Sequence, residues 1–268
     1  MGGTQISISE AIFLGIIQGL TEFLPISSSG HLVFFQTLFG IGGNPLFFDV
    51  MLHLGTLLAV IIFFRKDILK IFRGIVGIWK GRSNPQEGRI LLLWIILATL
   101  PTGLIGLLFK DWFESLFSEP RITAGMLLIT GSGLWLTRWV KREGRPLPAM
   151  RWIDALLIGI AQGVAIIPGI SRSGATISVG LFCGLDREPS GRFSFLLSIP
   201  AILGATLLEL RKISSPSELR MVLTGTATAF VIGFLSLTFL MKMIKLGKLS
   251  YFSYYCFAVG LLVIFLIK

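Results

Sequence analysis

Long apolar segments separated by short polar ones dominate the chain. Six of these segments resemble membrane-spanning helices, which need about 20 apolar residues to cross about 30 Å of hydrocarbon. They are Phe47–Phe64, Ile90–Phe109, Ile122–Val140, Phe193–Leu210, Leu219–Met241 and Tyr251–Ile267. The pattern therefore predicts an all-α polytopic membrane protein with six transmembrane helices.

Two further apolar regions are interrupted before they reach that length. Ile8–Leu24 stops at Pro25, and a second apolar arm, His31–Ile41, follows. At 1.5 Å per residue this arm would be only about 16 Å long, which is too short to cross. Trp152–Ile167 and Ala175–Leu185 repeat the design. Each region is predicted to be a re-entrant helical hairpin, whose irregular tip must be buried in protein or face a water-filled cavity.

The two predicted hairpins also share sequence. After a shift of 144 positions, Gly15–Gly30 aligns with Gly159–Gly174, and eight of the sixteen positions are identical. Three predicted spans separate the hairpins, and this odd number means that the second half enters the membrane upside down. We therefore predict a single membrane domain built as an inverted repeat, with the two hairpin tips meeting near the midplane. The first repeat is residues 1–144 with a hairpin at 8–41, and the second is residues 145–268 with a hairpin at 152–185.

Composition and charge support a membrane protein and indicate its orientation. The chain is 53% hydrophobic and 14% charged, with a net charge of +10, whereas soluble domains are about a quarter charged. One predicted side carries 17 Lys and Arg, in loops 65–89, 138–151, 186–192 and 242–248. The other side carries 6, in loops 110–121 and 211–220 and at Lys268. Positive residues favour the cytoplasm, which explains the charge without nucleic acid and places both termini and the opening of the first hairpin outside.

Polar and charged side chains gather at the two hairpin tips. They are Glu22, Ser27, Ser28, Ser29 and His31 in the first tip, and Ser171, Arg172 and Ser173 in the second. Ionisable groups at membrane depth are costly and are candidates for function. Free N–H groups at a helix start favour an anion, and a guanidinium matches phosphate oxygens. The pattern indicates a phosphate pocket. A structural ion pair would not need five flanking hydroxyl groups, and serine caps alone explain the doubled pattern with an intervening arginine poorly.

Both tips resemble signatures of a known family. The stretch QGLTEFLPISSSGH resembles the first signature of the BacA/UppP undecaprenyl-diphosphate phosphatases, and PGISRSGAT resembles the second. Gln18 and Glu22 match the E/Q-x-x-x-E pattern that begins the first signature. FFDVMLHLGTLLAV looks like the first full span of the family, although His53 stands where glutamine is expected. The resemblance extends over essentially the whole chain.

The resemblance implies an enzyme of the bacterial cytoplasmic (inner) membrane that hydrolyses undecaprenyl diphosphate, a prenyl diphosphate lipid used in cell-wall synthesis. Ser28 would be the nucleophile, Glu22 would assist it or bind a divalent cation, His31 would transfer a proton, and Arg172 would hold the diphosphate. The other predicted substrate-binding residues are Gln18, Ser27, Ser29, Gly30, Ser171, Ser173 and Gly174. The residues alone leave open whether His31 or Glu22 takes the serine proton. The anionic leaving group also predicts a cation, Mg²⁺ or Ca²⁺.

Asp49 and His53 are four residues apart and therefore share one helix face. They either support the site from behind, or Asp49 simply lies at the membrane interface.

Two other functions were compatible with parts of the pattern. Lipid phosphatases of the PAP2 type require a histidine after their Ser-Arg pair, but SGATISVGLFCGLD, which follows Arg172, contains none. A transporter or flippase for a prenyl phosphate or another anion would share the inverted repeat. A carrier, however, would not require a serine beside both a histidine and a glutamate.

Overall fold

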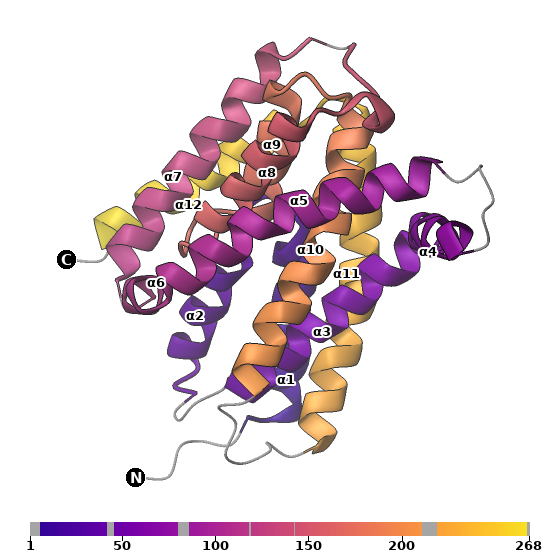
Figure 1. The fold of residues 1–268 in the computed structure, drawn as a ribbon. Helices are drawn as coiled ribbons and strands as arrows, with labels where there is room; N and C mark the ends of the chain where they lie inside the picture. The colour runs from indigo at the N-terminus through magenta and orange to yellow at the C-terminus, as the bar shows by residue number, and fades with distance from the viewer. Residues whose placement is uncertain are drawn as a thin grey trace.

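The computed structural model describes residues 6–41, 46–79, 86–117, 119–141, 143–210 and 219–266. Within these ranges the chain is helical and contains no β-strand (Figure 1). Its α-helices are α1 (Ile8–Phe23), α2 (Ser28–Leu38), α3 (Leu46–Phe63), α4 (Arg65–Trp79), α5 (Gln86–Leu108), α6 (Lys110–Leu116), α7 (Pro120–Leu136), α8 (Trp152–Val164), α9 (Arg172–Phe182), α10 (Arg187–Leu210), α11 (Leu219–Lys245) and α12 (Phe252–Leu266). Short 3₁₀ turns lie at Thr137–Trp139, Leu147–Ala149 and Leu249–Tyr251. The predicted all-α class is confirmed.

Four helices in the described ranges are long and apolar enough to cross a membrane, namely α5, α10, α11 and α12 with its preceding 3₁₀ turn. A fifth span exists if α3 and α4 are counted together, but these two helices meet at a bend of 74°. The remaining predicted span, Ile122–Val140, corresponds to α7, which has 17 residues and ends at Leu136. Residue Ile267, at the end of the last predicted span, lies outside the described residues.

The bend after α3 changes one prediction. The segment 65–89 was expected to be a loop, but its first part forms α4 and its last residues begin α5. Helix α4 packs along the start of α5, where Gly74 and Gly88 let the two backbones approach. Its exposed side chains include the apolar Leu69 and Phe72.

Local sequence explains why both hairpins break. Ser7 and Glu10 cap the start of α1 reciprocally, and Pro25 ends this helix because the residue before a proline avoids helical geometry. In the second hairpin, Gly169 has φ +92°, a conformation that glycine adopts without steric cost. The Ser171 side chain then accepts a hydrogen bond from the Gly174 N–H and caps α9. The predicted breaks are confirmed, but α2 and α9 each begin three residues earlier than expected.

Each half of the chain packs against the other half. Helix α1 contacts α11, α8 contacts α5, and α7 contacts α12. Glycines make the first two contacts close, since a methyl group added to Gly15 would lie 2.6 Å from the Gly225 carbonyl oxygen. A methyl group added to Gly159 would lie 2.1 Å from the Ala98 carbonyl oxygen. Small residues at these positions therefore let the first helix of each hairpin pack directly on a long helix of the other half.

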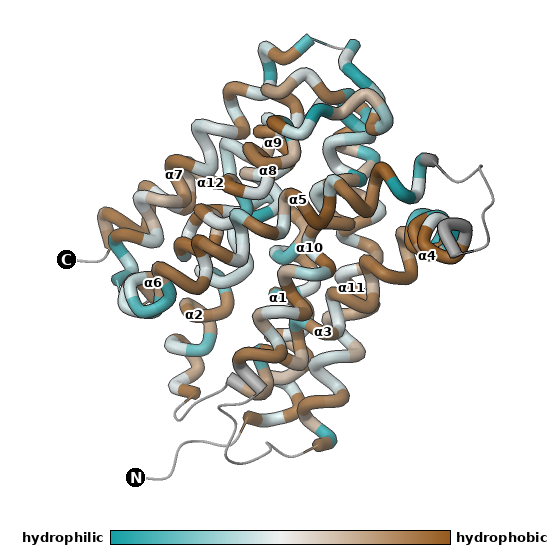
Figure 2. Tube along the Cα trace, in the orientation of Figure 1, coloured by the Kyte–Doolittle hydropathy of each residue, from teal (hydrophilic) through white to brown (hydrophobic). Residues whose placement is uncertain are grey.

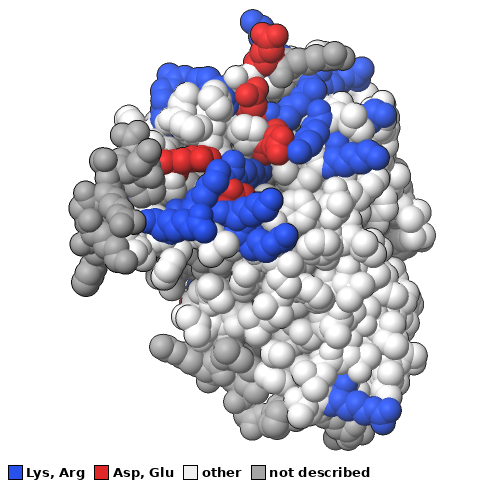
Figure 3. All heavy atoms as spheres, turned by 90° about the vertical axis from the view of Figure 1, so that its right-hand side faces the viewer, with Lys and Arg blue, Asp and Glu red and all other residues white. Residues whose placement is uncertain are grey.

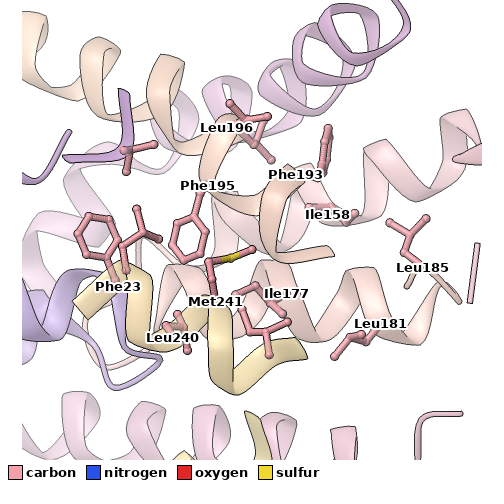
Figure 4. Close-up of a cluster of buried hydrophobic side chains, with 14 of the residues drawn as sticks. Phe23, Ile158, Ile177, Leu181, Leu185, Phe193, Phe195, Leu196, Leu240 and Met241 are labelled. Atoms are coloured by element: carbon pink, nitrogen blue, oxygen red, sulfur yellow. The ribbon is translucent and has the colours of Figure 1, made fainter. Parts of the chain in front are cut away.

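A cluster of buried apolar side chains lies beside the hairpins (Figure 4). It joins Phe23 of α1 to Phe195 of α10 through an edge-to-face ring contact with centroids 5.7 Å apart. Large apolar side chains are also exposed on the outside. Figure 2 shows hydrophobic residues along most of the helices. Leu107 is 65% exposed and Phe265 is 79% exposed. Such a surface suits hydrocarbon rather than water.

The close packing of α8 on α5 gives a testable prediction. Gly159→Ala should lower the free energy of unfolding by about 1–3 kcal/mol, because the new methyl group overlaps a backbone carbonyl that cannot move freely. Gly103→Ala is the matched control, since it adds the same methyl group on α5 where no atom lies within 4 Å. Thermal unfolding of the purified proteins in detergent measures both. Equal midpoints for the two variants would contradict this account of the helix contact.

Candidate active site at the hairpin tips

The two hairpin tips contact each other, as the sequence predicted. The Gly169 N–H of the second tip donates to Ser27 Oγ of the first at 3.1 Å. A methyl group added to Gly174 would lie 3.2 Å from the Pro25 Cβ. Residues about 140 positions apart thus form one continuous polar region in the interior.

The Glu22 carboxylate is the centre of this region and is 8% exposed. Its Oε1 accepts from Arg172 Nη2 at 2.6 Å. Its Oε2 accepts from Ser28 Oγ at 2.7 Å and from Gln18 Nε2 at 3.2 Å. A buried carboxylate requires such donors, because it has lost its hydration. The predicted residues Gln18, Glu22, Ser28 and Arg172 therefore form one hydrogen-bonded group.

Two polar atoms of this group have no protein partner among the described residues. They are Arg172 Nη1 and Gln18 Oε1, and both are buried. Most buried polar atoms in folded proteins are hydrogen-bonded, so each unpaired one requires an explanation. Arg172 Nη1 is a cationic donor, and its guanidinium group bonds to Glu22, the same carboxylate to which the Ser28 hydroxyl group donates. An anionic oxygen from a ligand would satisfy Nη1.

Ser28 occupies the first turn of α2, next to a strained residue. Ser27 has φ 68° and is the one non-glycine residue with positive φ in the described ranges. Such backbone geometry costs roughly 1–3 kcal/mol and persists only where the surroundings enforce it. The turn directs the Ser28 hydroxyl toward Glu22, which can accept its proton. Of the two bases that the sequence left open, Glu22 is the one that contacts Ser28.

His31 makes different contacts. Its Nδ1 lies 2.8 Å from the Ser27 carbonyl oxygen, and its Nε2 lies 2.7 Å from the Tyr255 hydroxyl. A carbonyl oxygen can only accept, so Nδ1 carries the hydrogen and Nε2 of the neutral ring accepts from Tyr255. Within the described part of the chain, both ring nitrogens are therefore occupied and neither bonds to Ser28.

Asp49 and His53 lie behind Glu22. His53 Nε2 is 3.7 Å from Glu22 Oε2, and its Nδ1 donates to the Asp49 carbonyl oxygen at 2.8 Å. The Asp49 carboxylate instead accepts from Gln36 Nε2 at 2.6 Å. His53 of α3 thus lies next to the Glu22 carboxylate of α1. The Asp49 side chain instead joins α3 to α2 through Gln36.

The remaining predicted binding residues mainly shape the two turns. Ser171 Oγ caps α9 and lies 3.2 Å from Ser173 Oγ, and the Ser171 N–H donates to Thr130 Oγ1 at 3.1 Å. Ser29 Oγ lies 3.5 Å from Ser27 Oγ. The two glycines, Gly30 and Gly174, lie where a side chain would meet a neighbouring residue at 3.2 Å.

The described residues hold no group of three or more His, Cys, Asp or Glu side chains that could enclose a metal ion. Glu22 and His53 are the pair nearest to that description, but both Glu22 oxygens already accept hydrogen bonds. The described residues therefore do not supply a complete cation site by themselves.

Tyr255 and Thr130 are the contacts that the sequence reasoning missed. Tyr255 is 224 positions from His31 and lies in an apolar segment with two other tyrosines, where an interfacial anchor was the simplest explanation. No local motif marks either residue, because each becomes a neighbour of the tips only when α7 and α12 pack beside them.

Comparison with known proteins agrees with the geometry of the tips. The family described as "Bacitracin resistance protein BacA" matches residues 11–262. A protein of Desulfosudis oleivorans named undecaprenyl-diphosphatase is 49% identical, over 94% of this chain and 95% of its own length. A protein of the same name from Desulfatibacillum aliphaticivorans is 46% identical, over 94% of this chain and 95% of its own length. Another from Halothermothrix orenii is 44% identical, over 97% of this chain and 98% of its own length. With its two signature tips in contact and the match extending over nearly its whole length, the chain belongs to the BacA family.

Proposed function

We propose that this protein is an undecaprenyl-diphosphate phosphatase, which converts the diphosphate lipid into undecaprenyl phosphate and inorganic phosphate. The observation that carries the proposal is the group formed by Ser28, Glu22 and Arg172, in which a buried guanidinium nitrogen has no partner among the residues that the structure describes. The relatives named undecaprenyl-diphosphatase support the identity of the substrate.

The proposed reaction begins with attack of Ser28 Oγ on the terminal phosphorus of the diphosphate. Glu22, at 2.7 Å, takes the hydroxyl proton as the new oxygen–phosphorus bond forms. The bond between this phosphorus and the bridging oxygen breaks, and undecaprenyl phosphate leaves. Water then hydrolyses the phosphoserine, which releases inorganic phosphate and restores the Ser28 hydroxyl.

Arg172 stabilises the charge that develops during this exchange. One of its nitrogens holds Glu22, and the other points a free donor at the position of the phosphoryl oxygens. Donors that are already in place when charge develops are the most effective, because they need no reorganisation. The same residue thus positions the base and binds the anion.

A divalent cation, Mg²⁺ or Ca²⁺, is part of the proposal. Since the described side chains do not enclose an ion, the diphosphate oxygens and water would supply most of its ligands, with Glu22 as the nearest protein carboxylate. The cation would neutralise charge on the diphosphate.

We further propose six spans and two re-entrant hairpins, with repeats 1–144 and 145–268 related by a pseudo-twofold axis in the membrane plane. The helix contacts support this arrangement. In chain order, α1, α3, α5 and α7 of the first repeat correspond to α8, α10, α11 and α12 of the second. The contact of α1 with α11 then corresponds to the contact of α8 with α5, and the pairs α7–α12 and α3–α10 each join two corresponding helices. Both hairpins also break at the aligned tips.

The proposed location is the bacterial cytoplasmic membrane, with both termini and the opening of the first hairpin on the external side. On the face in Figure 3, Lys and Arg side chains gather toward the end that holds α4 and the last turn of α11. Exposed basic residues there include Lys66, Lys70 and Lys245. This end would face the cytoplasm.

Ser28→Ala should lower phosphate release by at least about a thousandfold, because it removes the nucleophile. Ser132→Ala, an exposed serine on α7 that bonds only to its own helix, is the control and should keep full activity. Phosphate release from undecaprenyl diphosphate by purified protein in detergent is the measurement. It also tests the transporter alternative, because a carrier needs two compartments and an enzyme does not. Full activity of Ser28→Ala would assign the attack to another group.

Arg172→Lys should reduce kcat by about a hundredfold or more, because lysine keeps the charge but cannot hold Glu22 and a phosphate oxygen with two separate nitrogens. Arg138→Lys, where the guanidinium stacks on Trp135 away from the tips, is the control. The same detergent assay compares the two. A turnover near that of the unaltered protein would mean that Arg172 has only a structural role.

Orientation in the membrane can be tested with single cysteines. The two native cysteines are first replaced, as Cys183→Ala and Cys256→Ser. Serine at position 256 keeps a hydrogen-bond donor for the Pro25 carbonyl oxygen. Ser7→Cys should react with an impermeant thiol reagent on intact cells, because it begins the first hairpin on the external side. Ser83→Cys, which lies outside the described residues, should react only after lysis. The reverse pattern would place the opening of the site in the cytoplasm.

A further inference from the structure

Tyr255 connects the last helix of the chain to the first hairpin. Its hydroxyl lies 2.7 Å from His31 Nε2, and the two rings stack with centroids 5.8 Å apart and an interplanar angle of 21°. The neighbouring Tyr254 is 60% exposed and contacts Trp135 by its ring. Tyr254 therefore has the environment of a membrane-interface anchor, whereas Tyr255 directs its polar group into the site.

The contact supports the tautomer of His31 in which Nδ1 carries the hydrogen, the form that the Ser27 carbonyl also favours. A neutral imidazole has one donor and one acceptor. When the Tyr255 hydroxyl donates to Nε2, the hydrogen must reside on Nδ1, which donates to the Ser27 carbonyl oxygen at 2.8 Å. Without the Tyr255 donor, the Ser27 carbonyl would still favour hydrogen on Nδ1, but the tautomer with hydrogen on Nε2 would become more populated. In that tautomer, Nδ1 would face the carbonyl oxygen with a lone pair.

The Ser27 carbonyl matters because Ser27 has the strained backbone that precedes Ser28. Among the described residues, one contact from the second tip and one from the first turn of α2 hold it. The Gly169 N–H donates to its side chain, and His31 donates to its carbonyl. Losing the second would let the turn relax, and the hydroxyl of Ser28 would lose its alignment with Glu22.

We propose that Tyr255 is a positioning residue for the hydrolysis, acting through the His31 tautomer on the Ser27–Ser28 turn. This inference rests on the function proposed above. It also gives His31 a defined part: His31 holds the turn that presents the nucleophile, while Glu22 accepts the proton. Tyr255 touches neither Ser28 nor Glu22 in the described structure, so its effect must pass through the histidine.

The first test is kinetic. Tyr255→Phe keeps the ring and removes the hydroxyl, and it should lower kcat about tenfold, the equivalent of one hydrogen bond, while KM stays the same. Tyr254→Phe, the adjacent tyrosine, should leave both constants unchanged. Unaltered kcat in Tyr255→Phe would overturn the inference. An equal loss in both variants would also overturn it, since it would indicate a general effect on α12.

The second test does not require activity. The chain has only two histidines, so protein labelled with ¹⁵N-histidine gives two ring spectra, and loss of one set in His31→Gln identifies His31. We expect a single tautomer with hydrogen on Nδ1, and a mixture of tautomers in Tyr255→Phe. The same single tautomer in Tyr255→Phe would overturn the inference. Protein that shows the expected spectra but releases no phosphate would instead contradict the proposed function.

Discussion

The ion pair between Glu22 and Arg172 is the interaction on which the rest of the structure depends. Each tip places one charge in the interior, with the Arg172 side chain 16% exposed and the Glu22 side chain 7% exposed, and an unpaired charge there would be costly. Among the described residues, Arg172 is the nearest cation to Glu22, at 2.6 Å, whereas His53 lies 3.7 Å away. The pair therefore joins the two tips, and the helices on either side of each tip must end where they do.

Helix breaks and small residues make this meeting possible. An unbroken helix would carry the chain past the centre, whereas the turns at Pro25 and Gly169 expose backbone and side-chain groups there. Irregular backbone at this depth requires protein partners, and the opposite tip provides them. The glycine contacts of α1 with α11 and of α8 with α5 bring each hairpin close enough for the tips to touch. The glycine contacts between helices and the polar contacts between the tips therefore depend on each other.

The same pair explains why one group of residues can both stabilise the fold and carry out a reaction. Glu22 satisfies Arg172 on one oxygen and Ser28 on the other. Arg172 retains a donor that none of the described residues uses. A fully satisfied ion pair would stabilise the tips but would have nothing to offer a phosphate. The unpaired donor lies beside the Ser28 and Glu22 side chains, where it can bind a phosphate oxygen.

The sequence by itself determined the helical class, the two breaks and the residues at the tips, because apolar length, proline and glycine act locally. The prediction that the tips meet came from the repeat and is confirmed by the contact of Gly169 with Ser27. Helix α4 was missed because its segment was judged by its charge and not by its helical period. Only the tertiary structure decided that Glu22, and not His31, contacts Ser28, and that Tyr255 holds His31. Those contacts join residues up to 224 positions apart, and their geometry depends on how whole helices pack, which no local pattern specifies.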